Sequence, residues 1–175
     1  MDTYPPAMPE TVRGIFLDRA DFGRWVTETH KPLIRFCRQM VGDWAEAEDM
    51  AQEAYLHAWR KQGGFKGECS PLTWLMAIAR RVCLDHLRRR KRDGAVGLDE
   101  RRAASSPDSD ARADVQSALT KLNAEDRAVL YLRVEYGLPF GEAGRVLGCG
   151  AAACRKRFER AKKRFEAAYG GREGL

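Results

Sequence analysis

Hydrophobic residues recur every three or four positions along most of the chain, in two blocks that a polar stretch separates. The blocks cover 14–92 and 113–170, and neither shows the strict alternation of a half-buried strand. Between them, 93–112 contains glycine, serine, proline and five acidic residues, with Val96 and Leu98 as its only larger apolar residues. The pattern predicts an all-α protein of two small helical domains joined by a flexible linker.

The first block predicts three helices. An amphipathic stretch covers 21–41, where Pro32 is expected to kink or break the helix because proline has no N–H to donate. A second helix covers 44–61. Ser70 followed by a proline is a strong helix start, and the third helix runs from there to about residue 91.

On a helical wheel, the second helix has one core face and one polar face. The expected core residues are Met50, Ala51, Ala54, Tyr55, Ala58 and Trp59. The opposite face carries Asp49, Gln52 and Glu53, together with Leu56 and Arg60. Two interpretations of this polar face stay open: a solvated surface, or a docking face for a basic or polar groove.

The third helix also has two faces. Its expected buried stripe is Leu72, Leu75, Ile78, Ala79, Val82 and His86. On the other side Trp74, Arg81 and Arg88 recur every seven residues. An aromatic ring that stacks on a base, beside guanidinium groups that hold phosphates, suits single-stranded or partly melted DNA. The alternative is that Trp74 packs in the core.

The second block predicts three helical pieces within 118–168. Asn123 or Asp126 can cap the first, whose apolar set is Ala128, Val129, Leu132 and Val134. A short piece over 139–147, closed by Gly148, precedes a long basic helix over 151–169. The buried seam of that long helix is expected to be Cys154, Phe158, Ala161 and Phe165. A short helix, a glycine turn and a longer basic helix form the helix-turn-helix pattern, whose second helix enters the DNA major groove. A surface amphipathic helix is the alternative.

Charge and composition narrow the range of possible partners and compartments. The chain of 175 residues has a net charge of +6, and the windows 80–92 and 155–164 each hold seven basic residues against one acid. Polyanion partners are therefore favoured over a merely solvated surface. No stretch approaches the roughly 20 apolar residues that a membrane span needs. Residues 1–10 lack the apolar run of a signal peptide, so a cytoplasmic protein without membrane insertion is expected.

Neither catalysis nor a bound metal is expected. The chain has no Walker loop, no GxSxG and no HExxH, and its three histidines are isolated. Cys83-x2-His86 and Cys149-x4-Cys154 could be metal ligands, but Cys154 is needed in the buried seam and no four-ligand set is near it in sequence. The five cysteines are expected to be free thiols, with no cofactor.

Several segments, in the correct order, resemble the extracytoplasmic-function (ECF) sigma factors of the sigma-70 family. The segments 49–59, 70–80 and 85–91 resemble region 2, and 122–130, 136–142 and 148–164 resemble region 4. The resemblance implies an N-terminal extension (1–19), a region 2 helical bundle (20–92), a linker (93–112) and a region 4 helix-turn-helix domain (113–170). It implies a sigma factor that binds core RNA polymerase and directs promoter-specific initiation from −10 and −35 elements.

The resemblance also implies partners and roles. Asp49, Gln52 and Glu53 correspond to the face that binds the clamp helices of the largest polymerase subunit, region 4 rests on the flap of the second-largest subunit, and an anti-sigma factor is a further expected partner. The residues implied at the −10 element, including DNA melting, are Phe65, Lys66, Ser70, Trp74, Arg80, Arg81 and Arg88. Those implied at the −35 element are Arg155, Lys156, Arg157, Glu159, Arg160 and Arg164, with Arg157 and Arg164 expected on phosphates.

Some residues depart from the family pattern. Arg81 stands where asparagine is usual, Pro139 where a serine or threonine cap is common, and Lys156 where a small serine is usual. Gly141 and Gly144 lie inside a helix, where each costs up to about 1 kcal/mol against alanine. Region 4 is therefore expected to be only weakly stable when free.

Two questions stay open at this level. A stand-alone helix-turn-helix regulator would explain 113–170, but neither the polar face of the second helix nor the Trp74 stripe. The linker is expected to be cut by proteases, whereas a chain that resists cleavage there would indicate two docked domains.

Overall fold

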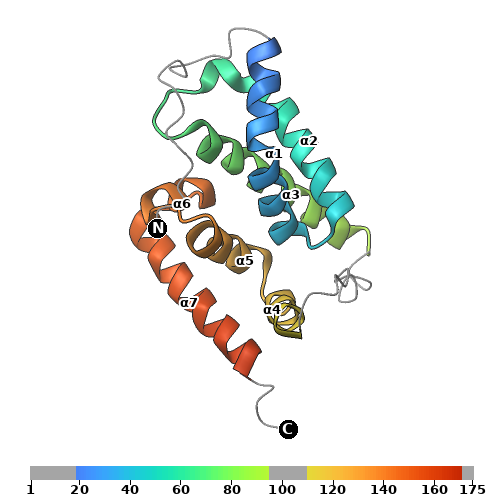
Figure 1. Cartoon of the computed structure of the whole chain (residues 1–175), viewed down its shortest axis with the longest axis vertical. Coiled ribbons are helices and arrows are strands. Elements are labelled where there is room, and N and C mark those ends of the chain that lie inside the picture. Colours follow the sequence, from blue (N-terminus) through green and yellow to red (C-terminus); the bar gives the residue numbers. More distant parts are fainter. Residues whose placement is uncertain (1–18, 95–109, 171–175) are drawn as a thin grey trace.

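The computed structural model describes residues 19–94 and 110–170, and all of their regular elements are helical (Figure 1). The all-α prediction is confirmed. Most of the predicted linker and N-terminal extension lies outside the described residues. The elements are α1 (Arg19–Val41), α2 (Trp44–Lys61), the 3₁₀ turn η2 (Gln62–Gly64), α3 (Pro71–Arg92), α4 (Asp110–Thr120), α5 (Ala124–Leu130), the π-helical turn η4 (Tyr131–Glu135), α6 (Phe140–Leu147) and α7 (Ala151–Gly170).

Helices α1, α2 and α3 pack together as the first bundle, and two of them begin at side-chain caps. The backbone N–H groups of Ala45 and Glu46 donate to Asp43 Oδ1 at 2.9 and 3.1 Å. At the start of α3, the backbone N–H of Thr73 donates to Ser70 Oγ at 3.0 Å, as the serine–proline pair predicts. These caps satisfy N–H groups that lack a partner within the helix.

Of the kink or break predicted at Pro32, the break does not occur, because α1 continues through it to Val41. Proline removes one backbone hydrogen bond. Leu33, Phe36 and Met40, directly after it, are all fully buried. Burying these side chains offsets the lost hydrogen bond, since a large apolar side chain contributes about 1.5–3 kcal/mol.

The second half contains the three predicted pieces and one further helix. Asn123 is the cap of α5: its Oδ1 accepts from the backbone N–H of Asp126 at 2.8 Å. Helix α4 was not predicted and begins inside the stretch expected to be linker. It contains few large apolar residues, so its periodicity is weak, and it packs on α7 with Ala118 buried.

The placement of Val134 in the core is also wrong, since this side chain is 71% exposed. Val134 lies in the π-helical turn η4, in which the backbone N–H of Tyr136 donates to the Tyr131 carbonyl at 2.9 Å. A π turn holds one residue more than an α turn. Even at the roughly 100° per residue of an ordinary α-helix, Val134 lies about 200° from Leu132, which is fully buried, so Val134 points away from the core face.

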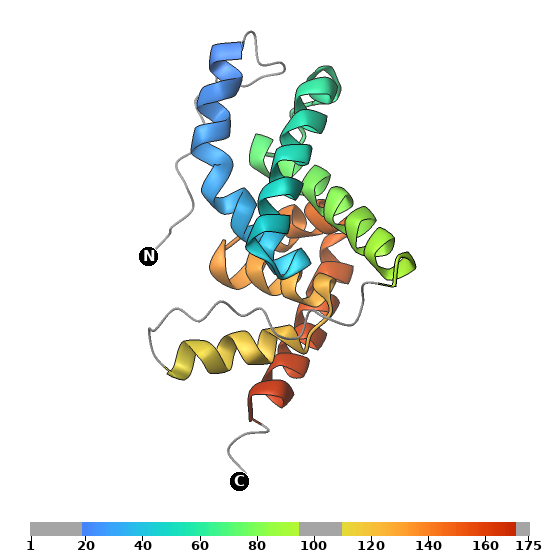
Figure 2. The same ribbon diagram turned by 90° about the vertical axis from the view of Figure 1, so that its right-hand side faces the viewer.

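The two halves are docked on each other. Helix α3 packs against α6 and α1 packs against α5 (Figure 2). One hydrophobic cluster therefore includes side chains from both halves. Arg127 of α5 donates to the carbonyls of Gln39 and Met40 at the end of α1, at 2.5 and 3.0 Å. Tyr131 donates its hydroxyl to the Pro32 carbonyl at 3.0 Å. Burial raises the pKa of this phenol, so it remains a donor near neutral pH.

The two glycines of α6 differ in their surroundings. A Cβ on Gly144 would lie 2.6 Å from the Cys149 carbonyl oxygen, whereas a Cβ on Gly141 would meet nothing within 4 Å. Gly144 is therefore required by the tight turn into α7. We expect Gly144→Ala to lower the free energy of unfolding of the full chain by about 1–3 kcal/mol. The matched control, Gly141→Ala, is expected to raise it by up to about 1 kcal/mol. Denaturant titration measures both; a Gly144→Ala chain as stable as the wild type would show that the turn relaxes freely.

Candidate nucleic-acid and polymerase interfaces

The polar face of α2 lies on the surface beside an apolar groove. Asp49 and Gln52 are exposed and Glu53 is half-buried, with its Oε1 3.6 Å from His57 Nε2. Leu56, on the same face, is 54% exposed. The adjoining groove is lined by Phe22, Val26, Gln52, Tyr55, Leu56 and Trp59. An exposed leucine beside an apolar groove, with carboxylate and amide groups at its rim, is typical of a protein-docking surface more than of a purely solvated one.

On α3 the buried stripe is rotated from the prediction. The buried residues are Thr73, Leu75, Met76, Ala79, Val82 and Cys83, whereas Leu72, Ile78 and His86 are only half-buried. The rotation follows from packing on both α1 and α6, which a wheel for a single buried face does not include.

Trp74 fits both interpretations that the sequence left open. It packs against the core cluster, and its ring lies 5.4 Å from that of Phe65 at an angle of 53°. It also lines a groove of about 670 Å³ between α2 and α3, together with His57, Lys61 and Arg81. An aromatic ring held by the core beside exposed cations is a suitable platform for stacking an unpaired base.

The remaining residues implied at the −10 element have different surroundings. Lys66, Arg81 and Arg88 are exposed, and Arg88 Nη1 lies 2.7 Å from Asp85 Oδ1. Ser70 has the structural role of capping α3, and its hydroxyl also donates to Thr73 Oγ1 at 2.8 Å. Arg80 is bound within the protein, as described below.

The loop that carries Phe65 and Lys66 approaches α6. Arg145 Nη1 of α6 lies 3.9 Å from Glu68 Oε2. Burial, with the nearby Glu142 carboxylate, raises the pKa of the Cys69 thiol in this loop. The loop and the first helix of the helix-turn-helix therefore lie side by side.

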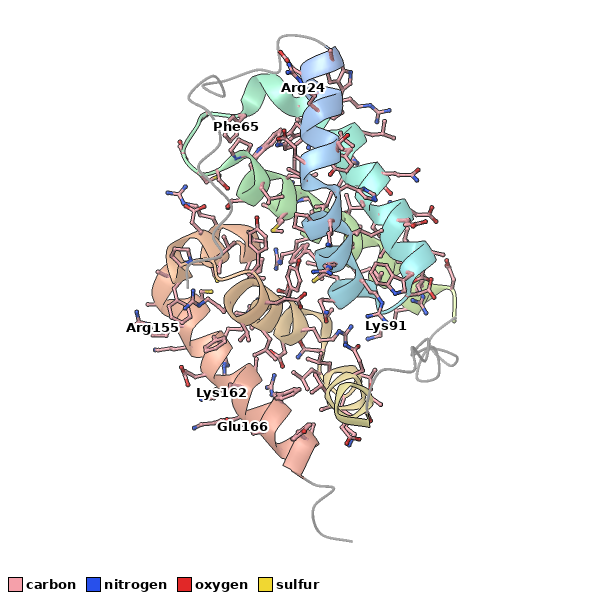
Figure 3. All side chains as sticks on the ribbon, in the orientation of Figure 1. Arg24, Phe65, Lys91, Arg155, Lys162 and Glu166 are labelled. Atoms are coloured by element: carbon pink, nitrogen blue, oxygen red, sulfur yellow. The ribbon has the colours of Figure 1, made fainter. Side chains whose placement is uncertain are left out.

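Helix α7 presents a basic outer face. Arg155, Lys156, Glu159 and Arg160 are exposed. In Figure 3, Arg155, Lys162 and Glu166 lie along its outer side and point away from the other helices. The inner seam is confirmed in part: Cys154 and Ala161 are fully buried, and Phe158 and Phe165 are half-buried.

The N-terminal half of α7 is held by aromatic contacts. Phe140 packs edge-on against Phe158, with 5.8 Å between ring centroids. The guanidinium carbons of Arg133 and Arg155 lie 4.2 and 5.0 Å from the Phe140 centroid. These cation–π contacts hold Arg155 in one region at the exposed end of the helix, before any ligand is present.

Three arginines implied in DNA contact form internal ion pairs. Arg80 of α3 and Arg157 of α7 both bind the Glu125 carboxylate, and Arg164 Nη1 lies 2.5 Å from Oδ2 of Asp126. The sequence alone predicts no role for Glu125 and only a possible capping role for Asp126. The available signal was two consecutive acids in the first turn after the Asn123 cap, where negative charge is favoured by the helix N-terminus.

The five cysteines are free thiols, as expected. Within 19–94 and 110–170, no three His, Cys, Asp or Glu side chains are grouped so that they could hold a metal ion. Over the same residues, no helix is both long enough and apolar enough to cross a bilayer.

Comparison with known proteins gives two family matches. Residues 25–93 match the model for sigma-70 region 2, and residues 112–165 match that for sigma-70 region 4. The chain is 30% identical to the ECF RNA polymerase sigma factor SigG of Mycobacterium tuberculosis over 85% of its length, but it spans only 48% of that protein. It is also 30% identical to SigM of the same species, spanning 85% of this chain and 76% of SigM.

Solved structures show a similar fold. The sigma factor RpoE of Bartonella quintana, in complex with the anti-sigma factor NepR, has a TM-score of 0.73 at 24% identity, covering 85% of this chain and 96% of that one. CnrH, in complex with the cytosolic domain of CnrY, has a TM-score of 0.66 at 24% identity, covering 89% and 91%.

Proposed function

Because the chain belongs to the ECF sigma factors of the sigma-70 family, we propose that it binds core RNA polymerase and directs initiation at promoters with −10 and −35 elements. The observation that carries the proposal is the pairing, on one chain, of a region 2 bundle with an exposed α2 face and a region 4 with an exposed basic helix α7. A stand-alone helix-turn-helix regulator needs the second feature only.

The site assignments belong to this proposal. We assign Asp49, Gln52 and Glu53 to the clamp helices of the largest subunit, and region 4 to the flap of the second-largest subunit. We assign recognition of the −10 element to the Phe65–Ser70 loop and to Trp74, Arg80, Arg81 and Arg88. We assign recognition of the −35 element to Arg155, Lys156, Arg157, Glu159, Arg160 and Arg164. The exposed positions of most of these side chains support the assignment.

We further propose an anti-sigma factor as a protein partner, because the similar RpoE structure is a sigma factor in complex with an anti-sigma factor, and the similar CnrH is bound to the cytosolic domain of CnrY. The proposed place of action is the cytoplasm, where core polymerase and promoter DNA meet. The proposed activity is binding without catalysis by the chain itself.

Run-off transcription with core RNA polymerase and genomic promoter fragments tests the proposal. Transcripts whose start sites share upstream −10 and −35 sequences are the expected result. A chain that neither binds core polymerase nor starts transcription, but represses or activates with another sigma factor, would support the stand-alone regulator.

Reversing one charge on the α2 face is expected to weaken core binding. The charged residues of the assigned face, Asp49 and Glu53, are both negative, so the face suits a basic partner surface. Glu53→Lys sets a positive charge against that surface, and like charges across an interface lower the affinity. We expect at least a tenfold loss in a competition assay against labelled chain, an effect of about 1.4 kcal/mol. Glu28→Lys on α1 makes the same charge change at another exposed position and serves as the control. Equal affinity of both variants would remove the α2 face from the interface.

A further inference from the structure

A single carboxylate connects region 2 to the recognition helix of region 4. Arg80 Nη2 donates to Glu125 Oε1 at 2.5 Å, and Arg80 Nε donates to Oε2 at 3.2 Å. Arg157 Nη1 donates to the same Oε2 at 2.8 Å. The side chains of Glu125, Arg80 and Arg157 are 25%, 21% and 30% exposed, so water and salt screen these pairs only in part.

This arrangement imitates the binding of a phosphate group. Guanidinium groups bind carboxylate and phosphate oxygens with the same planar, bidentate geometry. Glu125 therefore occupies, on Arg80 and Arg157, the position that a DNA phosphate would take. Two positive charges against one negative charge leave a local positive excess, which attracts a competing phosphate.

Geometry excludes promoter binding in this arrangement. Under the proposed function, Arg80 serves the −10 element and Arg157 the −35 element. The names of the elements place them about 25 nucleotides apart, which is roughly 85 Å along B-form DNA. Two arginines that share one carboxylate cannot lie over both elements at the same time. The chain must therefore open before it engages a promoter.

We propose that Glu125 is an internal phosphate mimic that latches region 4 onto region 2 and keeps the DNA-binding arginines of both occupied. The inference rests on the proposed function for the roles of the two arginines. The contacts of Arg127 with the end of α1, and of Arg145 with Glu68, support the docked arrangement around the latch. A closed chain lowers its own apparent DNA affinity by the fraction of molecules that are open.

The test compares Glu125→Gln with the wild type in the full chain. Glutamine keeps the size and one acceptor oxygen but removes the charge. Small-angle X-ray scattering is expected to show a larger radius of gyration for Glu125→Gln. Affinity for duplex DNA of arbitrary sequence is expected to rise roughly three- to tenfold, because opening no longer breaks the two charge-assisted hydrogen bonds from Arg80 to Glu125.

Glu135→Gln is the matched control. Arg35 Nη1 lies 3.7 Å from Glu135 Oε1 across the same interface, but both side chains are about half exposed, at 49% and 51%. An exposed pair of this kind contributes little, so the control chain should remain closed. Equal opening by both variants would overturn the latch, as would an unchanged radius and DNA affinity for Glu125→Gln.

A measurement on the wild-type chain tests the latch even if the Glu125→Gln variant misfolds. The radius of the wild type should grow with ionic strength as the Glu125 pairs are screened. The radius of a folded Glu125→Gln chain should change much less. A wild-type radius that is independent of salt would count against the latch.

Scattering and binding to arbitrary DNA do not depend on core polymerase. If Glu125→Gln opens the chain but no form of it supports run-off transcription, the proposed function fails and the latch remains as a contact that controls DNA access. If transcription succeeds and Glu125→Gln stays closed, the latch fails and the proposed function remains.

Discussion

Replacing Lys156 or Arg160 with alanine is expected to weaken binding to the cognate −35 element by about 1–3 kcal/mol and to relax its sequence preference. Both side chains are exposed in the N-terminal half of α7, the part of a recognition helix that reaches base edges. A contact to a base edge discriminates between sequences, whereas a contact to a phosphate changes the affinity for all of them.

Lys163→Ala is the control for this experiment. Lys163 is exposed further along α7, so its loss should weaken all sequences about equally and lower the logarithmic salt slope by roughly 1. Arg164 is less suitable than the sequence suggested, because it pairs with Asp126. The measurement is holoenzyme binding to a set of −35 variants at several salt concentrations. If Lys156→Ala and Arg160→Ala scale every variant by one common factor, they do not read bases.

Asp126→Ala is expected to lower the free energy of unfolding by about 2–3 kcal/mol. The Asp126 carboxylate is 5% exposed and binds Arg164 of α7. It also accepts from Asn123 Nδ2 at 3.0 Å, near the positive N-terminal end of α5. Removing the carboxylate leaves Asn123, which caps α5, and Arg164, which holds α7, without the acceptor that they share. DNA affinity should fall as well, because α7 is then held less firmly against α5.

Denaturant titration of the full chain measures this loss, and Asn123→Ala is the comparison. That variant removes only the cap and should cost about 1 kcal/mol. A double-mutant cycle of Asp126→Asn and Arg164→Gln isolates the pair. A coupling energy near zero would show that Arg164 is free to bind phosphate, as the sequence predicts.

Local signals in the sequence were sufficient for most of the architecture. The cap at Ser70 and the left-handed glycine at 148, with φ of 65°, lie where turn chemistry predicts them. The sequence predicts that Gly144 destabilises its helix, because helix propensity describes a residue without its tertiary neighbours. Only the structure shows the carbonyl of Cys149 above it.

The candidate site was predictable as a set of basic and aromatic positions, but not as a set of contacts. Arg80 and Arg157 were recognised by type and spacing. Their common partner, Glu125, lies 45 positions from Arg80 along the chain, and no periodicity connects them. Pairing between separate domains depends on how they dock, which a single helical wheel does not contain.

The π turn at Tyr131–Glu135 gives the chain a place where its length can change by one residue. Because a π turn holds one residue more than an α turn, deleting one residue there would let the segment close as an ordinary α-helix, and the residues that follow would keep nearly the same orientation. Tyr131 would keep its place against Pro32 of α1, and Leu138 and α6 would still meet the core. A one-residue deletion in relatives should therefore be tolerated better in this turn than inside α5 or α6, where it would rotate the following residues by about 100°.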